Sequence, residues 1–214
     1  MHFEILVEDA SSKIALENII DKILGPHGSP HTCKIIKYKG IGQLPKNLQG
    51  KTDPQKRILL DRLPQLLRGY GKSLTTDCVV IVLVDSDSKD CTELKKELLA
   101  LLDKCIPAPR TLFRIAIEEL EAWFLGDRHA LLSAYPSAKK SFIDHYKQDS
   151  VCGTWEKLAD IIYPGGSKAL KKIGWPGTGM EKCKWAEKIS PFMDVENNKS
   201  KSFQVFRDGL RRFI

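Results

Sequence analysis

A run of seven apolar residues in the middle of the chain constrains the fold most. Residues 78–84 read CVVIVLV, with no polar side chain at alternate positions to face water. A strand with this pattern is buried on both faces, which is typical of parallel sheets with helices packed on each side. We therefore expect residues 78–84 to be the central strand of an α/β protein.

Strand-like and helix-like patterns alternate around this run. The strand-like runs cover residues 3–8, 33–39, 78–84 and 111–117. Apolar residues at helical spacing follow each of them, over residues 14–24, 57–70, 94–102 and 118–132. This order predicts a mostly parallel sheet flanked by helices, with right-handed crossovers. The hydroxyls of Ser11 and Ser12 are candidate caps for the first helix, and we expect Pro64 at the start of a second segment in the helical pattern of residues 57–70.

The chain divides by charge and by pattern near residue 136. Residues 1–136 hold nearly equal numbers of basic and acidic residues, whereas residues 137–214 hold 15 Lys and Arg against 9 Asp and Glu. No strand-like run follows residue 136, and two or three short helices are expected around a Gly- and Pro-rich turn at residues 163–179. We predict an α/β domain over residues 1–136 and a basic, mainly helical extension over residues 137–214 that packs on it.

Composition indicates a globular protein of the cytoplasm. The chain is 42% apolar and 29% charged, and it has no run near the roughly 18 apolar residues of a membrane span. Its first nine residues, MHFEILVED, lack the basic start of a signal peptide, so we predict no export. The six cysteines are scattered without a C-x-x-C pair, which favours free thiols in a reducing compartment. We expect no membrane contact.

Acidic residues follow the strands at the edge where ligands bind in open parallel sheets. Glu8 ends the first strand, and Asp85 and Asp87 follow the third. If these strands are neighbours, the three carboxylates converge and repel one another unless a cation is present. Oxygen ligands without nearby His or Cys favour Mg²⁺ or Mn²⁺, which predicts a phosphoryl-transfer site. The alternative is that such acids cap helices, above all Asp90.

A second acidic group follows the fourth strand. Glu118 and Glu121 stand three residues apart on one face of the predicted helix, so one of them is expected to reach the site. We expect Glu119 and Asp127 to be solvated, and Trp123 to belong to the core.

These residues resemble the DUF4276 family, bacterial relatives of the TOPRIM-type catalytic domain of overcoming-lysogenization-defect nucleases. The resemblance spans nearly the whole chain. The matching pieces are LVEDAS at residues 6–11, LP at 63–64, LRGY at 67–70, VDSD at 84–87, DC at 90–91, RIAIEELEAW at 114–123, and Asn198 with Ser200, Ser202 and Phe203.

The resemblance implies a TOPRIM-like sheet and assigns roles to the acids. Glu8 would be the glutamate of the first motif and Asp85 and Asp87 the metal-binding pair, with Asp90 and Glu121 as supporting acids. It also implies a nuclease, often acting with an ABC- or AAA-type ATPase partner in defence against phage or plasmids. The sequence departs from the TOPRIM pattern in two ways. Asp9 stands where a glycine is expected, and the basic residue that assists cleavage has only Lys13 and Lys89 as candidates.

The leading hypothesis is therefore a metal-dependent nuclease whose basic C-terminal region guides a nucleic acid. Cations suited to phosphate contact are Lys199, Lys201, Arg207, Arg211 and Arg212. A solvated helix face is the alternative for these cations. Two other functions stay open: a non-catalytic subunit that binds nucleic acid and an ATPase, or an enzyme acting on a nucleotide or a phosphorylated small molecule. Residues 45–52 come within one residue of a phosphate-binding loop but begin with Pro45 in place of glycine.

Overall fold

Four parallel strands form the centre of the molecule. The structure is a computed structural model that describes residues 1–28, 30–45, 55–87, 89–148 and 153–214. The strands are β1 (His2–Val7), β2 (Thr32–Lys37), β3 (Cys78–Asp85) and β4 (Thr111–Ala116), in the order β2-β1-β3-β4. All neighbours are parallel, which confirms the predicted α/β class. Residues 45–52, which resemble a phosphate-binding loop, lie almost wholly outside the described residues.

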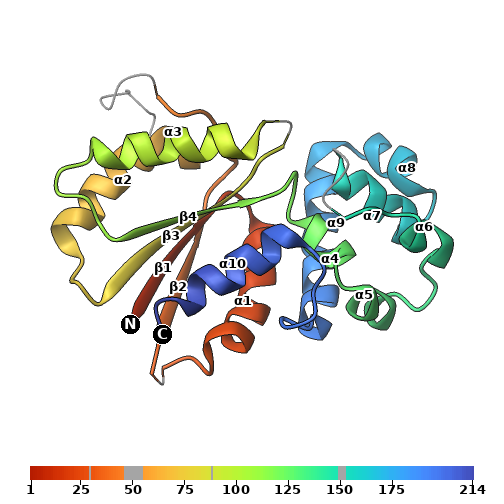
Figure 1. Ribbon diagram of the computed structural model, residues 1–214. Helices are drawn as coiled ribbons and strands as arrows, with labels where there is room; N and C mark the ends of the chain where they lie inside the picture. Colours follow the sequence, from red (N-terminus) through yellow and green to blue (C-terminus); the bar gives the residue numbers. More distant parts are fainter. Residues whose placement is uncertain (29, 46–54, 88, 149–152) are drawn as a thin grey trace.

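Helices cover both faces of the sheet, as the apolar run at residues 78–84 predicted. In β3, Val79, Ile81 and Leu83 belong to one hydrophobic cluster, whereas the alternate residues belong to the cluster on the other face. Helices α2 (Leu59–Ser73) and α3 (Cys91–Asp103) cover one face, and α1 (Ala10–Leu24) and α10 (Lys201–Arg211) cover the other (Figure 1). Burial of both faces accounts for the uninterrupted apolar character of this strand.

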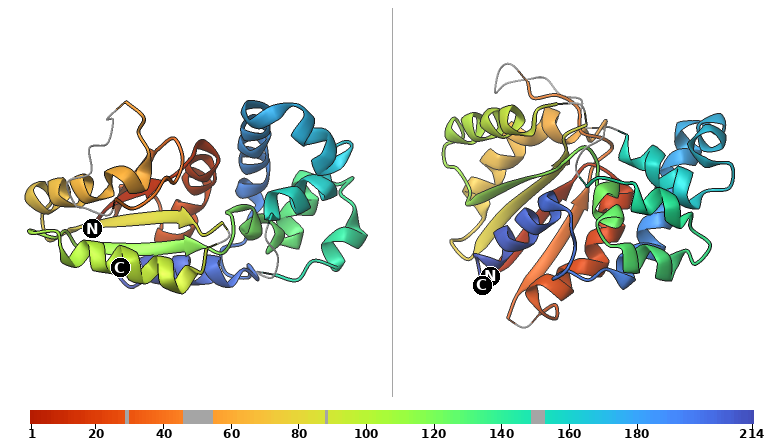
Figure 2. Two further views of the ribbon diagram at one scale, coloured as in Figure 1. Left: turned by 90° about the horizontal axis from the view of Figure 1, so that it is seen from above. Right: turned by 45° about the vertical axis from the view of Figure 1, so that its right-hand side comes forward.

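A group of short helices, here called the helical lobe, lies beyond the carboxyl ends of the strands (Figures 1 and 2). Its members are α4 (Glu121–Leu125), α5 (Arg128–Ala134), α6 (Lys140–Asp144), α7 (Thr154–Ile162), α8 (Gly166–Lys172), α9 (Gly174–Ile189) and the 3-10 helix η1 (Ser190–Phe192). Buried lobe residues such as Trp185 belong to the same hydrophobic cluster as Ile19 of α1. The division of the chain at residue 136 stays a prediction.

The helix predicted over residues 118–132 is wrong, because the chain breaks there into α4 and α5. Helix α4 ends at Leu125 with Gly126 as its cap, and Asp127 caps α5, accepting a hydrogen bond from the Ala130 N–H at 2.9 Å. The segment before α10 binds the other groups at the break: Asn198 donates to the Trp123 carbonyl at 2.8 Å, and the Lys199 N–H donates to the Gly126 carbonyl. These partners come from about 70 residues further along the chain, so local sequence does not reveal the break.

The turn predicted at residues 163–179 is also wrong, since these residues form α8 and the start of α9. Pro176 lies in the first turn of α9, where its missing N–H has no partner within a helix in any case. Further along, Trp185 and Ile189 are buried, and α9 packs against α1. This packing stabilises a helix that its glycines disfavour. Five helices, α6 to α10, occupy the described residues after 136, instead of two or three.

Two predictions about helix ends also need correction. The cap of α1 is the Asp9 carboxylate, which accepts from the Ser12 N–H at 2.7 Å; the hydroxyls of Ser11 and Ser12 do not cap the helix. Pro64 lies inside the single helix α2, which does not divide there. Trp123 is buried, as expected.

Arg114 joins α10 to the sheet. Its Nε donates to the Val205 carbonyl at 3.0 Å, and its side chain is close to Gly209, where a Cβ would contact the guanidinium.

The five cysteines in the described part of the chain are free thiols. None of the helices described combines the length and apolar character that crossing a bilayer requires.

Two glycines of α2 give a matched test of this packing. At Gly71 a Cβ would lie 1.9 Å from the backbone oxygen of Pro107, whereas at Gly69 it would meet nothing within 4 Å. We expect Gly71→Ala to lower the free energy of unfolding by about 1–3 kcal/mol. Gly69→Ala should raise it by up to about 1 kcal/mol, because alanine is the better helix former. Urea denaturation measures both, and equal effects would contradict the predicted contact.

Candidate functional site

Three of the predicted acids are carried to one edge of the sheet by β1 and β3. The two strands are parallel neighbours, with Val7 opposite Leu83. Glu8 therefore leaves β1 close to Asp85, the last residue of β3, and a backbone hydrogen bond from Asp85 reaches the Glu8 carboxylate. Asp87 follows two residues later and is exposed. The convergence of Glu8, Asp85 and Asp87 rests on this strand order.

The loops after β3 and β4 hold each other through backbone hydrogen bonds. The Glu118 N–H donates to the Ser86 hydroxyl at 2.7 Å, and the Asp87 N–H donates to the Glu118 carbonyl at 2.9 Å. Asp87 and Glu118 both adopt left-handed backbone conformations, with φ of 50° and 65°. Such conformations cost a non-glycine residue about 1–3 kcal/mol and concentrate at functional sites. The loops are thus held in one arrangement at the edge that carries the acids.

Helix α9 places a lysine among these carboxylates. The Lys182 Nζ lies 3.3 Å from the Glu121 carboxylate and 3.9 Å from that of Glu119, and its side chain is only 15% exposed. The acids Asp85 and Asp9 also act on its charge. Four carboxylates thus raise the pKa of Lys182 although burial alone would lower it, and the lysine stays protonated.

Burial raises the pKa values of the acids in this group. The pKa of Glu8 rises to about 8 through burial and through the charges of Asp9 and Asp87. The pKa of Glu121 rises to about 7, again mainly through burial, although Lys182 opposes the shift. Burial and the nearby Glu8 hold the pKa of Asp85 well above its ordinary value. Here the acidic cluster means Glu8, Asp85, Asp87 and Glu121.

Several oxygens of the acidic cluster lack hydrogen bonds. Among the described residues, neither carboxylate oxygen of the fully buried Glu121 has a hydrogen-bond partner, and the same holds for Oε2 of Glu8. Glu121 forms an ion pair with Lys182. Buried acceptors of this kind normally have partners, so these oxygens are free to bind a cation or a donor.

Other acids expected near the site serve the backbone instead. Asp90 is exposed and caps α3, accepting from the Thr92 and Glu93 N–H groups at 2.8 and 3.0 Å, which lowers its pKa. The capping alternative therefore describes Asp90 in this structure. The prediction that Glu119 and Asp127 are solvated is wrong.

Glu119 and Asp127 accept backbone hydrogen bonds at the starts of helices. Glu119 accepts from the Trp155 N–H at 2.8 Å at the start of α7, and Asp127 is buried at the start of α5. Both are needed because the short helices of the lobe leave N–H groups to be satisfied.

The role in cleavage predicted for Lys13 or Lys89 stays a prediction. Lys13 lies on α1 and pairs with Glu17 at 3.4 Å, whereas Lys89 is exposed beside the start of α3. Sequence reasoning missed Lys182 because residues 163–179 were predicted to be a turn, which concealed α9. No local motif marks Lys182, which is one of several lysines in a basic segment.

A divalent metal fits the chemistry of the acidic cluster but not its present spacing. The available donors are carboxylate oxygens, which favour Mg²⁺ or Mn²⁺. Yet within the described ranges no three His, Cys, Asp or Glu side chains are arranged to hold a metal ion. The Lys182 ammonium provides the positive charge between the acids. Metal binding would therefore require movement of acidic side chains and of Lys182.

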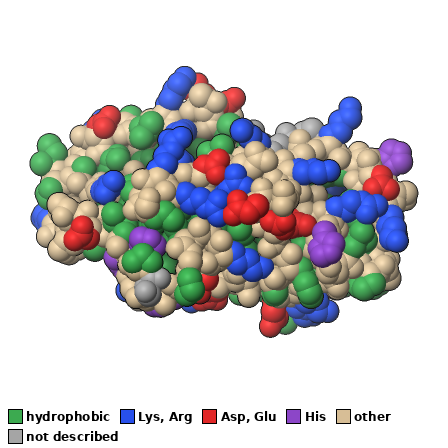
Figure 3. All heavy atoms as spheres, turned by 60° about the horizontal axis from the view of Figure 1, so that its bottom comes forward, with side chains coloured by type: hydrophobic (Ala, Val, Ile, Leu, Met, Phe, Trp, Pro, Cys, Tyr) green, Lys and Arg blue, Asp and Glu red, His purple; other side chains and the backbone are tan. Residues whose placement is uncertain are grey.

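The cations predicted to contact nucleic acid divide into two groups. Arg207 donates to the Val195 carbonyl at 2.8 Å, and Arg211 pairs with Glu196, so both stabilise the end of the chain. Lys199, Lys201 and Arg212 are exposed. On the face in Figure 3, which brings the underside of Figure 1 forward, basic and acidic side chains are interspersed. This face does not present a continuous basic surface.

The fold and the acidic cluster define the class: an α/β protein with buried acids at the carboxyl edge of a parallel sheet, closed by a helical lobe. The chain matches the family model described as Domain of unknown function (DUF4276) over residues 7–211, and it belongs to that family. Comparisons with curated proteins and with solved structures gave no match.

Lys182 can be tested against a neighbour on the same helix. Lys182→Met leaves buried acids without their cation, so at pH 8 it should lower the free energy of unfolding by about 3–5 kcal/mol. The loss should shrink at pH 5, where the raised pKa values keep Glu8 and Glu121 protonated. Lys184→Met, at an exposed site, is the control. Equal urea denaturation curves for the two variants at pH 8 would contradict the role of Lys182.

Glu8 predicts a dependence of stability on pH. Its pKa is about 8 in the folded protein and 4.5 ordinarily, so between these values the folded state holds a proton that the unfolded state has lost. The contribution of Glu8 to the free energy of unfolding is therefore full below pH 4.5 and declines as the pH rises toward 8. In EDTA, Glu8→Gln should flatten this decline, whereas the exposed Glu17→Gln should not. Urea denaturation at pH 5, 6.5 and 8 tests it; parallel slopes would rule it out.

Proposed function

We propose that this protein is a Mg²⁺- or Mn²⁺-dependent nuclease whose site is the acidic cluster. The observation that carries the proposal is a pair of acids beside Asp85 at the carboxyl edge of the sheet. Among the described residues, neither carboxylate oxygen of the fully buried Glu121 has a hydrogen-bond partner, and Oε2 of the partly buried Glu8 has none. Burying acids whose oxygens lack hydrogen-bond donors is costly to folding, and a site that binds a cation and a phosphodiester would account for their position.

Each residue of the cluster has a defined role in this proposal. Glu8, Asp85 and Asp87 would hold the metal, with Glu121 as a supporting acid. A bound Mg²⁺ or Mn²⁺ would lower the pKa of a water molecule and stabilise the charge on the phosphate. The hydrogen-bonded loops that carry Asp87 and Glu118 would orient the phosphodiester at this edge.

Lys182 takes the place of Lys13 as the basic residue of the proposed site. Its ammonium lies among the carboxylates and stays protonated. When a metal neutralises the acids, this ammonium would be free to donate hydrogen bonds to phosphate oxygens. Lys182 would thus stabilise negative charge that develops on the phosphate. Exposed Lys199, Lys201 and Arg212 would contact the backbone of the strand outside the site.

The wider setting of the proposal comes from the family resemblance. A TOPRIM-like relationship would make the parallel sheet the catalytic domain, and it suggests an ABC- or AAA-type ATPase as partner. The same resemblance suggests defence against phage or plasmids in the cytoplasm.

A second candidate function is a non-catalytic subunit that binds nucleic acid and an ATPase. The observation that favours it is the ion pair between Lys182 and Glu121, which compensates a buried acid without a metal. If this pair is permanent, it stabilises the packing of α9 on α4, and the cluster does no chemistry. The two functions differ in whether Mg²⁺ or Mn²⁺ binds.

Cleavage and metal binding can be measured on the same variants. We expect the purified chain to cut supercoiled plasmid, linear duplex, single-stranded DNA or RNA with Mg²⁺ or Mn²⁺ and not with EDTA. Asp85→Asn should reduce the rate at least about 100-fold, since one metal ligand and its charge are lost. It should also fold as stably as wild type or better, because repulsion with Glu8 is relieved.

Asp77→Asn is the matched control. Asp77 is exposed at the opposite end of the same strand, so this variant should cut as fast as wild type. The melting temperature of the wild type should rise with Mn²⁺, and that of Asp85→Asn should not. A metal response without cutting would direct the search to a missing partner. Neither response, or full activity in Asp85→Asn, would exclude the nuclease and leave the binding subunit.

A further inference from the structure

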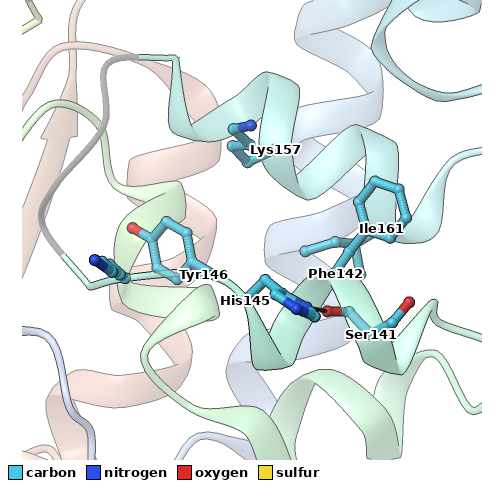
Figure 4. Close-up of a pocket in the computed structure, with 7 residues that line it drawn as sticks. Ser141, Phe142, His145, Tyr146, Lys157 and Ile161 are labelled. Atoms are coloured by element: carbon cyan, nitrogen blue, oxygen red, sulfur yellow. Dashed lines mark hydrogen bonds between the residues drawn. The ribbon is translucent and has the colours of Figure 1, made fainter.

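A pocket in the helical lobe has the chemistry of a nucleotide site. It lies between α6, the residues after it, and α7, and has a volume of about 510 Å³. Ligand pockets for small molecules fall in the range of roughly 300–1,000 Å³. Figure 4 shows Phe142 and Ile161 on one side, Tyr146 on the other, and Lys157 and His145 between them. The pocket therefore offers aromatic faces with a lysine beside them.

The aromatic residues of the pocket suit a planar ligand. Phe142 is 51% exposed, although burial of a phenylalanine normally stabilises a protein. Lys139 lies over its ring, with Nζ 5.2 Å from the ring centroid. Tyr146 is partly buried against the core, which fixes its ring at the wall. Rings held in this way are what stacking of a nucleobase requires.

The charges around the pocket select an anion. Its lining contains Lys147 and Lys157 and no carboxylate. The nearby acids are engaged elsewhere: Glu156 pairs with Lys171 at 3.1 Å, and Asp144 pairs with Arg128 at 2.9 Å. Among the described residues, no ion-pair partner is found for Lys157. An anionic group such as a phosphate would therefore find uncompensated positive charge at the rim.

Both walls of the pocket are attached to the loop and helix that carry Glu121. The Gln148 amide donates to the Ala122 carbonyl at 2.8 Å, close after Tyr146 in the chain. The first turn of α7 is capped by Glu119, which accepts from the Thr154 hydroxyl at 3.0 Å. The pocket is thus connected to the acidic cluster through α4 and the residues just before it.

We propose that this pocket binds a nucleoside monophosphate unit, with the base stacked on Phe142 and Tyr146 and the phosphate beside Lys157. The inference rests on the proposed function, since it supplies the substrate contact of a nuclease that holds an unpaired nucleotide near its site. A free nucleotide and the terminal nucleotide of a strand share this chemistry. A nucleotide inside a paired duplex does not, because its base is not accessible for stacking.

The experiment is calorimetric titration of the full chain in EDTA with four probes. They are dTMP, inorganic phosphate, a 5′-phosphorylated oligothymidylate and a blunt duplex. Binding of dTMP or the oligothymidylate should be tighter than binding of phosphate or duplex. Phe142→Ala should raise Kd at least about fivefold, the lower end of the effect of losing a stacking contact. Lys157→Gln should also raise Kd, because it removes the positive charge beside the phosphate. Lys168→Gln, at an exposed lysine outside the lining, should leave Kd unchanged.

The outcomes separate this inference from the nuclease proposal. Binding of dTMP alone would assign the pocket to a free nucleotide, and binding of the oligothymidylate would assign it to a strand. Asp85→Asn should bind as wild type does, since no metal is present, so loss of cleavage with binding retained would leave the pocket assignment intact. No binding of either nucleotide probe, or unchanged Kd in both Phe142→Ala and Lys157→Gln, would overturn the inference. Circular dichroism of the variants excludes unfolding as the cause.

Discussion

The acidic cluster depends on the Lys182 ammonium of α9, which pairs with Glu121 of α4 and also interacts with Asp85 at the end of β3. Glu121 is fully buried and has no hydrogen-bond partner among the described residues, so its charge depends on an ammonium supplied by α9. Breaking a buried pair of this kind costs about 3–5 kcal/mol, because it leaves a charge without compensation. Because Lys182 also interacts with Asp85, this arrangement of charges places α9 of the lobe against the carboxyl edge of the sheet. The geometry of the acidic cluster follows from that packing.

The position of the cluster is a consequence of sheet topology. Parallel strands end at the same edge, and the central pair β1 and β3 carries Glu8 and Asp85 there. Hydrogen bonds between the loops after β3 and β4 then hold two left-handed residues, Asp87 and Glu118. Such conformations persist only where the surrounding structure determines them. In this molecule the sheet supplies the rigid frame, and the lobe supplies Lys182 and the aromatic pocket.

Features that depend on local patterns could be predicted from the sequence, whereas features that depend on contacts between distant residues could not. Residues 78–84 predicted a central strand because burial on both faces leaves a local apolar pattern. The strand order was left open by the sequence, and the pairing of β1 with β3 brought Glu8 to Asp85. The helix over residues 118–132 was wrong because Asn198 and Lys199, distant in sequence, bind the backbone at its break. The turn at residues 163–179 was wrong because the packing of Trp185 stabilises α9 against its glycines.

By itself the sequence determined the α/β class, the parallel central strands and the acids that follow them. These depend on local apolar patterns and on strand ends, which a linear chain displays directly. Only the tertiary structure decided which cation meets those acids. In the sequence, Lys182 is one lysine among several; in the structure, the packing of α9 on α1 buries it beside Glu121. Lys13 pairs with Glu17 instead. Charge compensation depends on burial and on distances of a few ångströms, and both are set by packing between residues far apart in the chain.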